Sequence, residues 1–239
     1  MTPLRENLER LEEAILAACH AAGRARGEVE LMAVSKTFPA EAIAEAAGLG
    51  IGLFGENRVQ EFAAKVPALG PQRKGMECHL IGHLQSNKAA KAAEIFDGVD
   101  SLDSMRLAER LNEAAGRCGE RLPVLIEVKL SPEETKAGLD PESDDAAGLL
   151  ERLPDMAHLQ MCGLMTIAPW GVAEDVTREC FRSLRAWRNK WAAAYPALNF
   201  DVLSMGMSGD FALAIAEGAT RIRVGTAIFG KRAPYTGPA

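Results

Sequence analysis

Short apolar runs alternate with helical patterns along most of the chain. The runs are too continuously apolar for amphipathic helices, so they predict strands that are buried on both faces. Before the first run, apolar residues recur at helical spacing with charges between them, which predicts a helix over residues 4–22. The predicted strands cover residues 31–36, 51–55, 78–82, 98–102, 122–130, 159–167, 200–203 and 220–224.

Helical patterns follow seven of the eight strands, and residues 67–75 are expected to form a loop. Alternating strands and helices favour a parallel sheet, and eight repeats in 239 residues favour a closed (β/α)₈ TIM barrel with an extra N-terminal helix. We therefore expect one α/β barrel domain over residues 1–239. An open doubly wound sheet is the alternative, but the Gly-x-Gly-x-x-Gly fingerprint does not follow the first strand.

The composition narrows the class of protein. Hydrophobic residues make up 48% of the chain, and the net charge of -6 argues against non-specific binding to nucleic acid or anionic membranes. The five cysteines are scattered without a C-x-x-C pair, so we expect neither a disulfide framework nor a metal site. The charged N-terminus is unlike a secretory signal, and no apolar stretch is long enough to span a bilayer, so we expect a cytoplasmic protein.

Polar residues gather where the predicted strands end. In a (β/α)₈ barrel the chemistry occurs at the C-terminal ends of the strands, where residues far apart in sequence meet. This face is therefore the predicted site. The residues at these ends are Lys36, Asn57, His83, Asp103, Lys129, Thr166, Ser208 and the pair Gly225-Thr226.

Lys36 is the candidate nucleophile on this face, because it ends an apolar run that Pro39 then breaks. Burial disfavours a lysine's ammonium form and lowers its pKa, which makes the free amine available to attack carbonyl groups. A lysine at the end of a strand can also simply extend to water. Lys36 alone therefore does not establish carbonyl chemistry.

The loops after the last two strands predict an anion site. Residues 204–209 contain serine and glycine and lead into a helix, and Gly225-Thr226 follows the last strand. Barrels often hold phosphate with these two loops, although ordinary turns that need glycine would give the same pattern. A lysine beside a phosphate site suggests a phosphorylated carbonyl compound held as a Schiff base. A sugar phosphate, as in an aldolase, and pyridoxal 5′-phosphate both fit.

Six segments carry a more specific signal. They are AVSKT (33–37), FGENRVQE (54–61), HLIGHLQSNK (79–88), GLM (163–165), SMGMSGD (204–210) and RIRVGTAIFG (221–230). Together and in this order, they closely resemble the pyridoxal phosphate homeostasis protein family, of the proline synthase co-transcribed type. The resemblance covers nearly the whole chain.

The resemblance implies a fold-type III barrel related to the N-terminal domain of alanine racemase, with Lys36 as the Schiff-base residue for pyridoxal 5′-phosphate. Arg223 matches the arginine that faces the pyridine nitrogen, where a cation disfavours protonation and leaves the ring a weaker electron sink. Lys136 and the tail from Lys231 receive no role. The other matches are Asn57, which lines the cofactor, and Ser208, Gly225 and Thr226 at the phosphate.

These features predict a binding protein rather than an enzyme. Racemisation needs a base on each face of the carbanion, and related alanine racemases supply the second base as a tyrosine from an additional domain. Neither Tyr195 nor Tyr235 lies at a predicted strand end. We expect a monomer that holds pyridoxal 5′-phosphate for intracellular homeostasis without efficient turnover, with apo enzymes as recipients. The alternatives are a racemase dependent on this cofactor and a Schiff-base aldolase.

Overall fold

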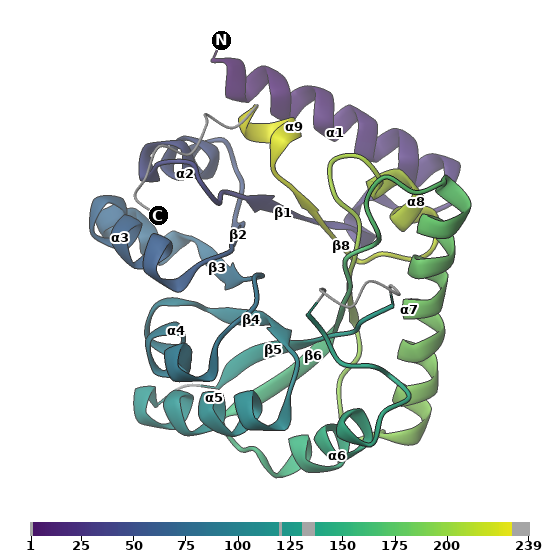
Figure 1. The fold of residues 1–239 in the computed structure, drawn as a ribbon. Helices are drawn as coiled ribbons and strands as arrows, with labels where there is room; N and C mark the ends of the chain where they lie inside the picture. The colour runs from purple at the N-terminus through teal and green to yellow at the C-terminus, as the bar shows by residue number, and fades with distance from the viewer. Residues whose placement is uncertain (1, 120, 131–136, 231–239) are drawn as a thin grey trace.

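The computed structural model describes residues 2–119, 121–130 and 137–230. Within these ranges eight parallel strands close into a barrel in sequence order, and the last strand pairs with the first (Figure 1). The predicted (β/α)₈ fold is therefore confirmed. The strands are β1 (Glu30–Val34), β2 (Leu53–Glu56), β3 (Glu77–Leu80), β4 (Gly98–Leu102), β5 (Leu122–Glu127), β6 (Leu159–Met165), β7 (Val202–Ser204) and β8 (Arg221–Val224).

Helices surround the barrel, and the extra N-terminal helix α1 packs against α8 and α9 (Figure 1). Within the described ranges, no helix combines the length and the apolar character needed to cross a membrane. The helices are α1 (Pro3–Ala21), α2 (Ala40–Gly48), α3 (Val59–Leu69), α4 (Ala89–Ile95), α5 (Met105–Cys118), α6 (Asp144–Arg152), α7 (Glu174–Ala194), α8 (Phe211–Ala216) and α9 (Thr226–Phe229). Short 3₁₀ turns lie at Arg26–Glu28, Gly70–Gly75, Ser86–Lys88 and Leu153–Asp155.

The structure corrects several predicted elements; for example, β6 ends at Met165 rather than at residue 167, and β7 spans Val202–Ser204 rather than residues 200–203. Helix α9 follows β8, so every strand is followed by a helix rather than seven of the eight. Helix α3 continues through Pro67 to Leu69 where a loop was expected, because buried Leu69 packs into the core and anchors the last turn. Strand β5 ends at Glu127 rather than at residue 130, and the next residue, Val128, forms a bridge with Leu139.

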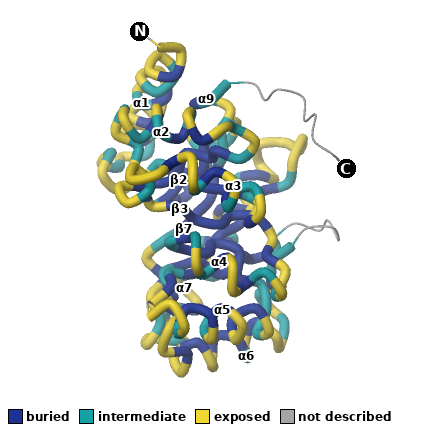
Figure 2. Tube along the Cα trace, turned by 90° about the vertical axis from the view of Figure 1, so that its left-hand side faces the viewer, coloured by how far each residue is buried: buried dark blue, intermediate teal, exposed yellow. Residues whose placement is uncertain are grey.

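Packing follows the hydrophobic pattern. The strands are buried at the centre, and the exposed residues lie on the outer faces of the helices (Figure 2). Met32 and Val34 belong to a small apolar cluster inside the barrel, whereas Ala33 between them belongs to the larger core beneath the helices. Alternate residues of β1 therefore face opposite sides of the strand, as the period of two requires.

The N-terminal end of the barrel interior contains an ionic network. His79 Nδ1 lies 2.7 Å from Asp100 Oδ1, and His79 Nε2 lies 2.8 Å from Glu77 Oε1. Arg221 donates to Asp100 Oδ2 at 3.3 Å and to Glu30 Oε2 at 2.8 Å. Because His79 and Asp100 are almost fully buried, each charge depends on its partners for stability.

This network holds His79 in its charged form. Burial opposes the imidazolium, but the charge of Asp100 and the hydrogen bonds to Asp100 and Glu77 outweigh it and raise the pKa of His79 to about 9. Gly98 makes room for the ring, since a Cβ at this position would lie 2.5 Å from the nearest ring carbon.

We predict that the free energy of unfolding falls at alkaline pH. The pKa of His79 rises from 6.5 in the unfolded chain to about 9 in the fold, so its stabilisation is complete below pH 6.5 and lost as pH rises through 9. The loss is on the order of 3 kcal/mol, at about 1.4 kcal/mol per pKa unit. Urea unfolding between pH 6 and 10 measures it. The variant His79→Gln should lack this slope; an equal slope in the variant would contradict the assignment.

Candidate ligand-binding site

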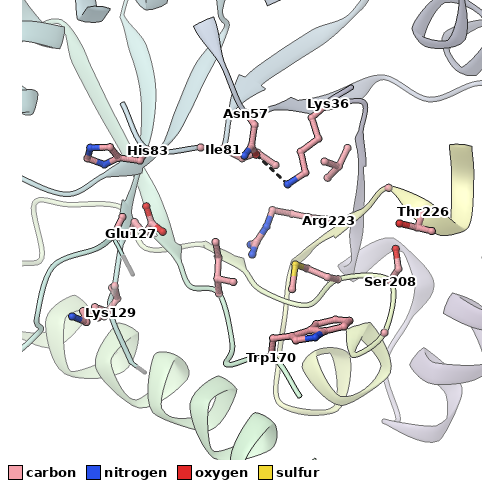
Figure 3. Close-up of a pocket in the computed structure, with 18 of the residues that line it drawn as sticks. Lys36, Asn57, Ile81, His83, Glu127, Lys129, Trp170, Ser208, Arg223 and Thr226 are labelled. Carbon is pink, nitrogen blue, oxygen red and sulfur yellow. Dashed lines mark hydrogen bonds between the residues drawn. The ribbon is translucent and has the colours of Figure 1, made fainter. Parts of the chain in front are cut away.

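A cavity of ≈ 660 Å³ opens at the C-terminal ends of the strands, within the size range of small-molecule sites (Figure 3). Among the residues at the predicted strand ends, His83 and Lys129 line this cavity. Asp103 contacts His83 and Thr166 contacts Arg223, and both contacted residues line the cavity. The closed barrel thus brings the predicted strand ends together. The residues predicted to contact a ligand all line the cavity: Lys36, Asn57, Ser208, Arg223, Gly225 and Thr226.

Lys36 projects into the cavity from the turn after β1 (Figure 3). Its Nζ donates a hydrogen bond to Asn57 Oδ1 at 3.4 Å, and Asn57 comes from the end of the neighbouring strand β2. The lysine is half-buried rather than extended into solvent. An amine held in this way can meet a carbonyl group inside the cavity.

Arg223 lies at the centre of the cavity floor, between Lys36 and Glu127 in Figure 3. Its guanidinium donates to Ser204 Oγ and to the carbonyl oxygen of Thr166, both at 2.8 Å, so the ends of β7 and β6 fix its orientation. Burial lowers its pKa from the ordinary value, but an arginine remains cationic at neutral pH. The floor of the cavity therefore carries a fixed positive charge.

Ser208, on the loop after β7, and Thr226, the first residue of α9 after β8, lie at one end of the cavity (Figure 3). Gly225 allows the chain after β8 to approach β1, because a Cβ there would lie 3.0 Å from the carbonyl oxygen of Val34. Two hydroxyl groups beside closely packed backbone offer hydrogen bonds to an anion.

Glu127 lines the opposite side of the cavity, at the end of β5 (Figure 3). It is only 5% exposed, and its Oε2 has no hydrogen-bond partner within the described residues. Burial and the nearby charge of Asp103 raise its pKa to about 7, against the opposing effect of Arg223 and His83. The cavity therefore contains a carboxyl group that exchanges a proton near neutral pH.

Sequence reasoning missed Glu127 because the predicted strand continued to residue 130 and made Lys129 its polar end. The available signal was the charge itself, since a carboxylate within an otherwise apolar run is rarely buried without a role. Lys136 and the tail from Lys231 lie outside the described residues. Within the described ranges, no cluster of three or more His, Cys, Asp or Glu residues could hold a metal ion.

Comparison with known proteins identifies the family. The family model described as alanine racemase, N-terminal domain, matches residues 7–233. The pyridoxal phosphate homeostasis protein of Escherichia coli strain K12 is 41% identical over 237 residues, which span 97% of this chain and 98% of that protein. The protein of the same name from Vibrio cholerae is 42% identical and covers equal shares. The chain belongs to the pyridoxal phosphate homeostasis protein family.

The structural comparison agrees. PipY of Synechococcus elongatus has been solved with and without bound pyridoxal phosphate, and each structure superimposes with a TM-score of 0.84 at 43% identity. The match covers 95% of this chain and 100% of PipY. The resemblance drawn from the six sequence segments is therefore confirmed.

Proposed function

We propose that this chain binds pyridoxal 5′-phosphate, holds it reversibly through Lys36 and thereby takes part in intracellular homeostasis of the cofactor. The proposal rests mainly on one observation: the same cavity contains the amine of Lys36, the fixed cation of Arg223 and the anion-binding end with Ser208 and Thr226. The names of the relatives and the bound ligand of PipY support the same function.

The residues of the cavity fit this cofactor. When bound, pyridoxal 5′-phosphate supplies an aldehyde that forms a Schiff base with a lysine amine. In this chain Lys36 would provide that amine, and Asn57 would orient it through the hydrogen bond already present. The hydroxyl groups of Ser208 and Thr226, with the backbone from Gly225, would bind the phosphate.

Arg223 would limit the chemistry to holding the ligand. A guanidinium has hydrogen-bond donors only, so beside the pyridine nitrogen it would favour the unprotonated ring. Its bonds to Ser204 and Thr166 fix it in place. An unprotonated ring withdraws electrons less strongly than a protonated one, which argues for binding without efficient turnover.

We predict that the purified protein, loaded with pyridoxal 5′-phosphate, shows a visible absorption band that Lys36→Ala abolishes. The alanine variant has no side-chain amine to react with the aldehyde at this position. Absorption spectra before and after dialysis measure this, with Lys91→Ala on the exposed face of α4 as the control. A colourless wild-type protein that cannot be loaded would contradict the function and leave an aldolase as the better hypothesis.

We predict that the double variant Ser208→Ala with Thr226→Ala retains the cofactor poorly. Each lost hydrogen bond to a charged group costs about 1.5–3 kcal/mol, so the affinity should fall at least roughly a hundredfold. Equilibrium dialysis gives the dissociation constant. The control Ser183→Ala, on α7, should bind like the wild type. An unchanged affinity in the double variant would place the phosphate elsewhere.

Amino-acid racemisation is the second candidate function, and Glu127 is the observation that favours it. A racemase needs a second acid–base group besides its lysine. Tyr195 directly follows α7 and does not line the cavity, and Tyr235 lies outside the described residues. Glu127, with its pKa raised to about 7, is an acid–base group that lines the cavity across from Lys36.

We predict no steady racemisation by the loaded protein, because the fixed charge of Arg223 weakens the electron sink that this reaction requires. Chiral chromatography of alanine and other amino acids after prolonged incubation provides the measurement. Multiple turnovers that both Lys36→Ala and Glu127→Gln abolish would establish the racemase instead. Turnover unaffected by these substitutions would indicate a contaminating enzyme.

The cellular role is a further part of the proposal. We propose a monomeric cytoplasmic protein that supplies the cofactor to apo enzymes. The relatives' names refer to homeostasis of pyridoxal phosphate and support such a role. Reactivation of an apo enzyme by the loaded protein, in the presence of a trap for free cofactor, would demonstrate direct delivery; blocked reactivation would restrict the role to storage.

A further inference from the structure

A buried ionic cluster lies behind the turn that carries Lys36. We call Ser35, Glu56, Glu61 and Lys65 the Lys65 cluster. Lys65, on α3, is only 9% exposed, and its Nζ donates to Glu56 Oε1 at 2.7 Å, to Glu61 Oε1 at 2.8 Å and to the carbonyl oxygen of Ser35 at 3.2 Å. The three protons of the ammonium thus have three acceptors. No member of the cluster is among the residues that line the cavity.

The cluster holds the chain on both sides of Lys36. On one side, Ser35 Oγ donates to Glu56 Oε1 at 2.8 Å, while the Ser35 carbonyl accepts from Lys65. On the other side, the backbone N–H of Thr37 donates to Glu61 Oε1 at 2.6 Å. The residues immediately before and after Lys36 are therefore fixed to the same group of charges.

Thr37 has an unusual backbone conformation. Its φ is +69°, and within the described ranges it is the only residue other than glycine with a positive φ. This left-handed region is unfavourable for a β-branched residue, so surrounding interactions must maintain it. The bond from Thr37 N–H to Glu61 is charge-assisted and suits that role. Burial opposes the charge on Glu61, but hydrogen bonds from Lys65 and Thr37 lower its pKa below the ordinary value.

Stability alone does not account for this cluster. Glu56 is fully buried, and its Oε2 has no hydrogen-bond partner within the described residues. Burial raises the pKa of Glu56 against the opposing effect of Lys65, which shows that its surroundings disfavour the charge. A buried ion pair generally stabilises a fold no more than well-packed apolar residues would, whereas its directional bonds fix local geometry.

We propose that Glu61 and Lys65 are positioning residues, which hold the turn at Thr37 so that the Lys36 amine points into the cavity before a ligand arrives. This inference rests on the proposed function, because it assigns the Lys65 cluster to the reaction of Lys36 with an aldehyde. Glu61 acts from behind the turn and does not touch the ligand.

A double-mutant cycle between Glu61→Gln and Thr37→Gly tests the proposal. Glu61→Gln keeps the shape of the side chain but removes its charge, so the affinity for pyridoxal 5′-phosphate should fall about tenfold, or about 1.4 kcal/mol. Glycine adopts a positive φ without steric cost. Thr37→Gly should therefore restore at least about threefold of the affinity lost in the Glu61→Gln protein, a coupling that independent sites do not show.

A second ligand separates positioning from a general structural effect. Pyridoxine 5′-phosphate has the same ring and phosphate but an alcohol in place of the aldehyde, so it does not react with Lys36. Its affinity should be the same in the wild type and in Glu61→Gln. The matched control Glu94→Gln, which removes a carboxylate paired with Lys91 on the exposed face of α4, should change neither affinity.

Glu61 is the substitution of choice because its side chain is 26% exposed, whereas replacing Lys65 would leave Glu56 buried without its ion partner. Urea unfolding confirms that each variant is folded. Equal losses for both ligands, or no recovery with Thr37→Gly, would overturn the positioning role. Binding of pyridoxal 5′-phosphate by the wild type decides the proposed function separately, since the inference depends only on differences between variants.

Discussion

The pairing of the first strand with the last is the constraint on which the site depends. Strand β8 pairs with β1 from Arg221 opposite Glu30 to Val224 opposite Ala33. This register places Gly225 against the Val34 carbonyl, where no side chain would fit without displacement. Lys36 and Thr226 come from opposite ends of the chain, and barrel closure brings them to one cavity.

Two arginines on β8 divide the barrel interior into two layers. Arg221 and Arg223 are two residues apart and point inward, while Ile222 between them belongs to the core beneath the helices. Arg221 is neutralised by Asp100 and Glu30 at the N-terminal end. Arg223, at the other end, donates its hydrogen bonds to a hydroxyl and a carbonyl group, neither of which carries a charge. One layer therefore stabilises the barrel, and the other presents a charge to the cavity.

Much of this arrangement could be predicted from the sequence. The strands are continuous apolar runs, and their ends are marked by polar residues such as Lys36 and Asn57, so the fold and the face of the barrel followed. Glu127 was not placed, because its position depends on where β5 ends and Val128 begins to pair with Leu139. The left-handed turn at Thr37 was also hidden, since it depends on Glu61 from another element rather than on a local glycine signal.

We propose that Lys36, among all the lysines of this chain, holds the cofactor. Borohydride reduction of the loaded protein fixes the bound group permanently, and peptide mapping by mass spectrometry then locates it. We expect one pyridoxyl group per chain, on the peptide that contains Lys36. A pyridoxyl group on Lys65, Lys129 or another lysine, with Lys36 unmodified, would contradict it.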